Sequence, residues 1–157
     1  MKDKLRVLVS QCLLGVACRY DGKSVFCESV RRLMDACEVI PVCPEILGGM
    51  TTPRPPSERQ GERVVNNLGQ DVTAAFLRGA DQALHLARLF GVKYAVLKQR
   101  SPSCGSEMIY DGTFSGGKIP GKGVTAEAFE REGIRIFDED HICELIDILE
   151  DEHNDTL

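Results

Sequence analysis

The chain has 157 residues, of which 43% are hydrophobic and 27% charged, a size and composition that fit one globular domain and exclude a disordered chain. Its formal net charge is -5, which argues against a nucleic-acid binder, because such proteins usually carry a basic surplus. No apolar run approaches the roughly 18 residues of a membrane helix, and the run behind the N-terminal lysines is too short for a secretory signal. We therefore expect a cytoplasmic protein with no membrane segment and no strong nucleic-acid signal.

The first half of the chain alternates between strand and helix patterns. The apolar run at 5–10 predicts a buried strand, and residues 28–37 carry apolar side chains at helical spacing. A second strand is expected at 38–42. The following segment, 43–61, contains a Pro-Arg-Pro-Pro run that excludes a regular helix, so a loop is predicted. Residues 62–67 fit a short extra strand.

The second half continues this alternation. The longest helix is predicted at 72–90, where apolar residues recur every three or four positions up to Gly91. A strand at 93–98 precedes a long loop at 100–123 that is rich in glycine and serine. Thr125 is expected to cap the short helix that follows. The last two predicted elements are a strand at 134–139 and a helix at 141–152.

Strands that alternate with helices predict right-handed βαβ units and a parallel sheet covered on both faces. The expected fold class is therefore α/β, a small doubly wound, Rossmann-like or flavodoxin-like, mostly parallel sheet. We expect a single domain over residues 1–150 and an acidic tail at 151–157 that frays. The loops at 43–61 and 100–123 are long enough to indicate a functional role, and each begins just beyond a predicted strand.

Three of the seven cysteines occupy matching positions in the predicted sheet. Cys12, Cys43 and Cys104 each come at or shortly after the end of a strand. Because parallel strands share one direction, their carboxyl ends lie at the same edge, where open α/β sheets bind ligands. Cytosolic thiols stay reduced, and an odd number of cysteines cannot pair completely. We therefore expect these three thiols to converge and hold a metal centre.

The other cysteines have different surroundings. Cys37 and Cys143 fall on apolar helix faces and are expected in the core, and Cys27 opens a predicted helix and is expected to be structural. Cys18 lies in the same loop as Cys12, so its place inside or outside the site is left open. Zinc sites usually draw on close Cys-x-x-Cys pairs, and the chain contains none. Three thiolates suit a cluster with one open iron or a metal with an open position, and the spacing leaves both open.

Four motifs stand beside these cysteines. They read SQCLLGVACRYDG at 10–22, PVCPEILGGM at 41–50, PRPPSE at 53–58 and KQRSPSCG at 98–105. In combination they resemble the DUF523 family, whose characterised members are thiouracil desulfidases. The later GKGVTA at 121–126 also fits, so the resemblance spans nearly the whole chain.

The resemblance implies a [4Fe-4S] cluster held by Cys12, Cys43 and Cys104, with the fourth iron open to the sulfur of the substrate. It implies a non-redox reaction that converts a small thiolated nucleobase, a thiouracil, to uracil and sulfide. Glu45 and Ser101 stand at the motif positions implied to be catalytic. Glu45 is placed to take a proton from water, and Ser101 to donate to a ring atom or orient the water. Without the motif, each would be interpreted as an ordinary loop or turn residue.

Three further residues are candidate substrate contacts. Ser103 can assist in the tasks of Ser101, Tyr20 can stack on a pyrimidine, and Arg54 is expected to shape the rim of the pocket. Two other functions remain open. The chain can be a non-catalytic module that holds zinc or a redox-sensing cluster, or a metal-free enzyme in which Cys104 is the nucleophile. The last needs a nearby base, and no histidine adjoins the motifs.

Overall fold

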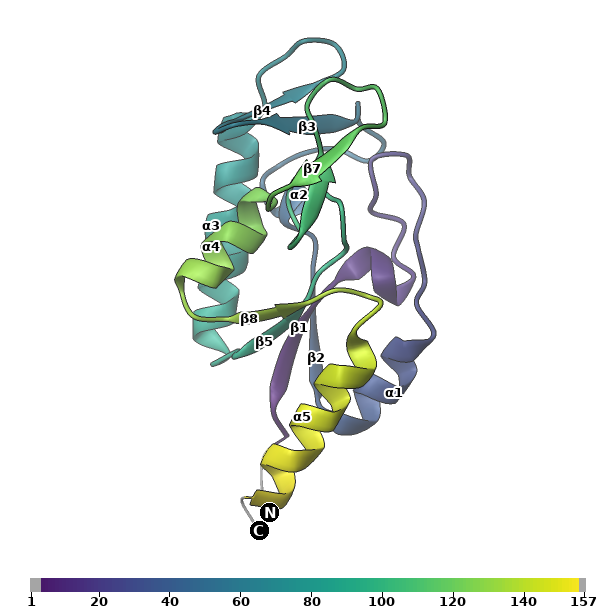
Figure 1. Cartoon of the computed structure of the whole chain (residues 1–157), viewed down its shortest axis with the longest axis vertical. Coiled ribbons are helices and arrows are strands. Elements are labelled where there is room, and N and C mark those ends of the chain that lie inside the picture. Colours follow the sequence, from purple (N-terminus) through teal and green to yellow (C-terminus); the bar gives the residue numbers. More distant parts are fainter. Residues whose placement is uncertain (1–3, 156–157) are drawn as a thin grey trace.

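A four-stranded parallel sheet forms the centre of the computed structural model, which describes residues 4–155 (Figure 1). Its strands are β1 (Arg6–Ser10), β2 (Glu38–Val42), β5 (Tyr94–Val96) and β8 (Arg135–Phe137), in the order β2-β1-β5-β8. Each neighbouring pair runs parallel. The predicted α/β class with a mostly parallel sheet is confirmed. Counted in chain order, the strands follow the 2-1-3-4 arrangement with which flavodoxin-like sheets begin.

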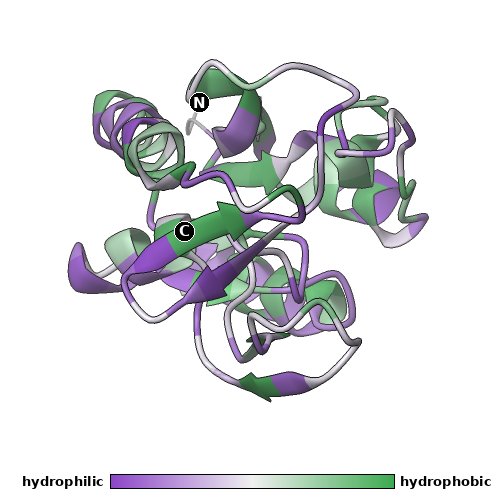
Figure 2. Ribbon diagram, turned by 90° about the horizontal axis from the view of Figure 1, so that it is seen from above, coloured by the Kyte–Doolittle hydropathy of each residue, from purple (hydrophilic) through white to green (hydrophobic). Residues whose placement is uncertain are grey.

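Helices cover both faces of this sheet. Helices α1 (Ser29–Ala36) and α5 (Ile142–Asp155) pack together on one face, and α3 (Thr73–Leu89) and α4 (Val124–Arg131) pack together on the other (Figure 1). Their ribbons carry both hydrophobic and hydrophilic stretches, as amphipathic helices on a sheet do (Figure 2). None of the helices in residues 4–155 is long and apolar enough to cross a membrane.

The apolar run of β1 serves both faces at once. Val7 and Val9 pack among residues of α1 and α5, whereas Leu8 packs against α3 and α4. All three side chains are 0% exposed. A strand that is covered on both faces has no solvent side, which explains its continuous hydrophobic pattern. Burial of each such side chain stabilises the fold by about 1.5–3 kcal/mol.

Two small antiparallel hairpins lie beyond one edge of the sheet, at the top of Figure 1. The first pairs β3 (Ser57–Gln60) with β4 (Arg63–Asn66), and the second pairs β6 (Met108–Tyr110) with β7 (Lys118–Pro120). Strand β4 confirms the short strand predicted at 62–67. The other three strands fall in the segments predicted as long loops, because these segments are rich in proline, glycine and serine, residues that are typical of loops.

Two short helices follow strands of the main sheet. The 3-10 helix η1 (Gln11–Leu14) comes directly after β1, and α2 (Pro44–Leu47) follows β2 within the segment predicted as loop. Pro44 stands at the first position of α2, where its missing N–H costs nothing. Both helices therefore begin at the carboxyl edge of the sheet, where the candidate cysteines lie.

Two local predictions are wrong and two others stay untested. Thr125 does not cap α4, because the helix starts at Val124 after Gly123, and Thr125 is fully buried inside it. Cys143 is exposed, since it lies outside the apolar face of α5, whereas Cys37 is in the core as predicted, at 2% exposure. Helix α5 reaches Asp155, and residues 156–157 of the predicted fraying tail lie outside the described residues. The single domain over 1–150 and the fraying stay predictions.

The backbones of α2 and α3 touch at two glycines. A Cβ on Gly79 would lie 1.9 Å from the carbonyl oxygen of Pro44, and a Cβ on Gly48 would lie 2.1 Å from the carbonyl oxygen of Ala75. Any side chain at either position would push the helices apart. This contact therefore sets the position of α2 relative to the sheet.

Replacement of Gly79 by alanine is expected to lower the free energy of unfolding by about 1–3 kcal/mol through overpacking, although alanine favours a free helix over glycine by about 1 kcal/mol. Urea unfolding measures the change. Gln82→Ala, at an exposed position of the same helix, is the control and should stay within about 0.5 kcal/mol of the wild type. A Gly79→Ala protein as stable as the wild type would contradict this close contact.

The buried thiol of Cys37 is expected to lower the stability of the fold at alkaline pH. Burial raises the pKa of this thiol from 9.0 to about 11. Because the unfolded chain loses the thiol proton first, the stabilisation is fully present below about pH 9 and is lost as the pH rises through about 11. We expect the wild type, with its thiols kept reduced, to lose up to about 2 kcal/mol more than Cys37→Ala over that interval. Equal losses in urea unfolding would rule out this role for Cys37.

Candidate active site

A cavity of about 460 Å³ opens at the carboxyl ends of β1, β2 and β5, and β3 and β6 of the hairpins complete its wall. The sheet order places β2 and β5 on opposite sides of β1, which is the switch point where open α/β sheets bind ligands. Every candidate residue named from the sequence lines this cavity: Cys12, Tyr20, Cys43, Glu45, Arg54, Ser101, Ser103 and Cys104. The predicted convergence at one sheet edge therefore agrees with the structure.

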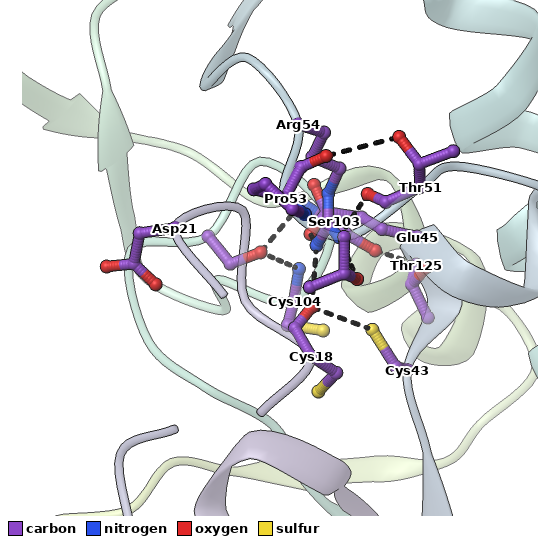
Figure 3. Close-up of polar contacts among 12 residues, drawn as sticks. Cys18, Asp21, Cys43, Glu45, Thr51, Pro53, Arg54, Ser103, Cys104 and Thr125 are labelled. Atoms are coloured by element: carbon purple, nitrogen blue, oxygen red, sulfur yellow. Dashed lines mark hydrogen bonds and ion pairs between the residues drawn. The ribbon is translucent and has the colours of Figure 1, made fainter. Parts of the chain in front are cut away.

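The three candidate ligand cysteines enter the cavity from three strands. Cys12 lies in η1 after β1, Cys43 caps the start of α2 after β2, and Cys104 lies in the loop after β5. Their exposed fractions are only 8%, 7% and 5%. Figure 3 shows the sulfur atoms of Cys43 and Cys104 below Glu45 and Arg54. The sheet thus places three buried thiols around a common space.

Two of these three thiols, those of Cys43 and Cys104, have raised pKa values, which favours their protonated form. Burial raises the pKa of the Cys104 thiol to about 12. The pKa of Cys43 is also raised, first by a hydrogen bond with the thiol of Cys18 and then by burial. Metal binding replaces the thiol proton, so a cation is the partner that would stabilise thiolates here. The donor set, three cysteines at the wall of one cavity, fits an iron-sulfur cluster, whose irons are bound by cysteine thiolates.

A single metal ion needs its ligand side chains to meet at one point, which a cluster does not. Within residues 4–155, no three histidine, cysteine, aspartate or glutamate side chains are arranged to share one ion. The cysteines of a cluster bind separate irons, so they need to surround a common space and not one point.

Cys18 supplies a fourth thiol to the same cavity. It is 7% exposed, and the Sγ atom of Cys43 lies 4.0 Å from its carbonyl oxygen. A hydrogen bond with Cys12 is the main cause of the raised pKa of Cys18. The sequence left the place of Cys18 open, and the structure puts it between Cys12 and Cys43.

Glu45 is held in the first turn of α2, two residues beyond Cys43. Its Oε2 atom accepts a hydrogen bond from the guanidinium of Arg54 at 2.7 Å. The side chain of Glu45 is 18% exposed and that of Arg54 only 2%. Glu45 thus combines access to the cavity with a fixed ion-pair partner.

Ser101 organises the loop that carries Cys104. Its Oγ atom accepts hydrogen bonds from the backbone N–H groups of Ser103 at 3.1 Å and Cys104 at 3.0 Å. The turn-capping interpretation of this serine is therefore correct, but it does not exclude a chemical role. Because the oxygen accepts in both of these bonds, the hydroxyl hydrogen of Ser101, which lines the cavity, remains available as a donor.

The other two candidate contacts differ in exposure. Ser103 is 1% exposed, and its hydroxyl lies 2.8 Å from that of Thr125 at the start of α4. The first N–H groups of α4 also donate to the carbonyls of Pro102 and Ser103, so Ser103 helps to anchor the Cys104 loop. Tyr20 is 41% exposed and stands at the mouth of the cavity beside Arg19. Substrate contact by Ser103 and Tyr20 stays a prediction.

The cavity wall also contains polar residues that the sequence did not indicate. Ser10 is 3% exposed, accepts a hydrogen bond from the backbone N–H of Lys98 at 3.0 Å and lowers the pKa of Cys104 by a side-chain hydrogen bond. Lys98 forms an ion pair with Glu139 at 2.6 Å. Ser10 was counted as the end of a strand, and only its place as the first residue of the motif at 10–22 signals a role in the site.

Comparisons with known proteins agree with this geometry. The family model described as 2-thiouracil desulfurase matches residues 7–141. The uncharacterized protein YbbK of Bacillus subtilis (strain 168) is 44% identical over 150 residues, which cover 89% of this chain and 99% of that protein. The solved structure of the [4Fe-4S]-dependent thiouracil desulfidase TudS is 46% identical, with a TM-score of 0.87, and the match covers 95% of this chain and 99% of that one. The chain belongs to the 2-thiouracil desulfurase family.

Proposed function

We propose that this protein is a [4Fe-4S]-dependent thiouracil desulfidase, which hydrolyses the C–S bond of a thiolated uracil to give uracil and sulfide. The observation that carries the proposal is a single cavity lined by three buried cysteines together with Glu45 and Ser101. The 46% identity to TudS over 95% of the chain supports the same activity. A reducing cytoplasm suits a site whose ligands must stay thiols.

Cys12, Cys43 and Cys104 are the proposed ligands of the cluster, leaving the fourth iron without a protein ligand. Their origin in three separate strand ends supports this assignment, because the sheet fixes their relative positions before any metal binds. When bound, the cluster supplies a Lewis acid that draws electron density from the sulfur of the substrate and weakens the C–S bond.

The reaction needs no electron donor or acceptor. The C–S bond breaks, and a C–O bond forms with the oxygen of water. The two protons of that water leave with the sulfur, as H₂S or as HS⁻ and a proton. The protein must therefore provide a group that moves a proton and a group that orients the ring.

Glu45 is the proposed proton acceptor. Its Oε2 atom is paired with Arg54, and among the described residues no partner occupies Oε1, so this oxygen can take a proton from the attacking water. The same carboxyl then returns the proton to the departing sulfur. Glu45 lies in the first turn of α2, which starts directly after the proposed ligand Cys43, and it lines the cavity in which the substrate would bind.

Ser101 is the proposed hydrogen-bond donor to the ring. Two backbone N–H groups already point at its oxygen, and this polarisation strengthens the hydroxyl as a donor. A donor fixed in this way can hold a ring oxygen or nitrogen as charge develops on the pyrimidine. Its hydroxyl position is set by the turn, so little reorganisation is needed during the reaction.

The other functions are less well supported. A structural zinc or redox-sensing module has no use for a carboxylate and a serine in the wall of the cavity that the cysteines share. A nucleophilic Cys104 needs the thiolate form, but burial raises the pKa of that thiol to about 12, which leaves it protonated at neutral pH.

The test is product formation by protein reconstituted with iron and sulfide without oxygen. With 2-thiouracil or 4-thiouracil in ¹⁸O-labelled water, we expect uracil carrying one new labelled oxygen and one sulfide for each uracil. Cluster-loaded protein that forms no uracil from either compound would refute the proposed activity. Uracil without the label would refute attack by water.

A further inference from the structure

Arg54 lies deep in the wall of the cavity and away from its rim. Only 2% of its side chain is exposed. Its guanidinium contacts Glu45 and the loop of Cys18 (Figure 3). The sequence analysis expected Arg54 at the rim of the pocket, whereas the structure buries it in the wall. Substrate contact by Arg54 stays a prediction.

Hydrogen bonds fix this guanidinium on two sides. One terminal nitrogen donates to Oε2 of Glu45 at 2.7 Å and to the carbonyl oxygen of Cys18 at 3.0 Å. The other donates to the carbonyl oxygen of Thr51 at 3.1 Å and to the hydroxyl of Thr52 at 3.2 Å. Four acceptors from three segments of the chain therefore determine where the positive charge lies.

The backbone of Arg54 is fixed as well. Its N–H donates to the carbonyl oxygen of Tyr20 at 2.8 Å. The 51–54 segment is thereby tied to the loop that carries Cys18. The position of the positive charge that faces Glu45 therefore depends on both of these loops.

Stability alone does not account for this ion pair. A buried pair of charges gains little over well-packed apolar side chains, because both ions must leave water. The Nε atom of Arg54 is buried without a hydrogen-bond partner among the described residues, which adds a further cost. An arrangement that is costly for folding and lies beside a proposed proton acceptor points to a role in the reaction.

The pair restricts Glu45 in a way that suits proton transfer. The hydrogen bond from Arg54 to Oε2 restricts rotation of the carboxyl group and thereby limits the directions in which Oε1 can point. The proton acceptor must lie within hydrogen-bond reach of its water, and small errors in position are costly to the rate. A free glutamate side chain in the same place would sample several rotamers.

We infer that Arg54 is a positioning residue that holds the carboxylate of Glu45 in its reactive orientation, an inference that rests on the proposed function. Arginine suits this task because its planar fork donates to several acceptors in fixed directions. Lysine carries the same charge as a single point and lacks the fork, and glutamine has fewer donors and no charge.

The test compares Arg54→Gln and Arg54→Lys with the wild type, all loaded with cluster. Iron content is measured first. We expect kcat to fall about 10- to 100-fold in Arg54→Gln, with KM changed less than about threefold, because misplaced catalytic groups lower the rate of the chemical step. Arg54→Lys should recover part of kcat.

Arg59→Gln is the matched control. Arg59 is also enclosed, pairs with Glu127 at 2.6 Å and donates to two backbone carbonyls, but it does not line the cavity. We expect its kcat to stay within about twofold of the wild type. A loss as large as that of Arg54→Gln would overturn the inference, because it would reflect a general loss of structure.

Other results would also overturn the positioning role. A raised KM with unchanged kcat in Arg54→Gln would make Arg54 a substrate contact, and an unchanged kcat would remove it from the reaction. Loss of iron in both Arg54 variants would show that the residue maintains the cluster loop and not Glu45.

A second measurement separates this inference from the proposed activity. Urea unfolding of the cluster-free wild type, Arg54→Gln, Glu45→Gln and the double variant gives the coupling between the two side chains. Additive effects would overturn the inference even if the enzyme is active. If cluster-loaded wild type forms no uracil, the proposed function fails, whereas a coupling in this cycle still establishes the Arg54–Glu45 contact.

Discussion

Replacement of Cys104 by alanine is expected to abolish cluster assembly and turnover together. Cys104 is the most enclosed of the three proposed ligands, at 5% exposure, and no other thiol comes from its loop. Loss of a residue that only supports a ligand costs about 10- to 100-fold in metal affinity or activity, so loss of a ligand itself should cost more. The visible absorption of the reconstituted protein and its rate of uracil formation measure both effects.

Cys143→Ala is the control for this experiment. Cys143 is exposed on the outer side of α5 and does not line the cavity. Its loss should leave the absorption and the rate unchanged. If Cys104→Ala keeps a full cluster and wild-type turnover, Cys104 is not a ligand and the proposed site is wrong.

Glu45→Gln should separate proton transfer from cluster binding. Glutamine keeps the shape of the side chain but cannot take a proton from water, so kcat is expected to fall about 100- to 10,000-fold. Iron content should stay at the wild-type level, because the carboxylate is not a proposed ligand. Steady-state rates with thiouracil, divided by the iron-loaded fraction, give the comparison.

Glu127→Gln provides the matched control for Glu45. Glu127 is also paired with an arginine, Arg59, but lies outside the cavity. Its substitution should change kcat by less than about twofold. Wild-type rates in Glu45→Gln would remove the carboxylate from the mechanism and assign proton transfer to another group.

The sheet was predictable from the sequence because its strands and main helices carry strong periodic patterns. The apolar run at 5–10 became β1, and the long helical pattern at 72–90 became α3. Strands β3, β6 and β7 and helix α2 were missed because they lie in segments rich in proline, glycine and serine, a composition typical of loops. Thr125 was misplaced because a residue with capping chemistry can instead pair its hydroxyl inside the helix, as it does with Ser103.

The meeting of the cysteines followed from topology alone. Parallel strands end at one edge, and Cys12, Cys43 and Cys104 follow three of them. The roles of Glu45 and Ser101 came from the family resemblance, since a loop carboxylate and a turn serine are ordinary features. Their geometry still supports a role beyond the motif, because both line the cavity that the cysteines share.

The orientation of the Arg54 side chain could not be predicted from the sequence. Periodicity does not describe the path of a proline-rich segment, and the preferred surface position of arginine favoured the rim. The structure instead turns Arg54 inward to Glu45. Cys18 is a similar case, since its distance in space from Cys43 depends on how the loop after η1 folds back.

The proposed reaction depends on an iron-sulfur cluster that three cysteines of one cavity would hold. The most direct test is the content of iron, acid-labile sulfide and zinc in wild-type protein purified or reconstituted without oxygen. We expect about four irons and four sulfides per chain, as in a [4Fe-4S] cluster, with little zinc. Stoichiometric zinc, or protein that takes up no iron under these conditions, would show that the three cysteines do not hold such a cluster.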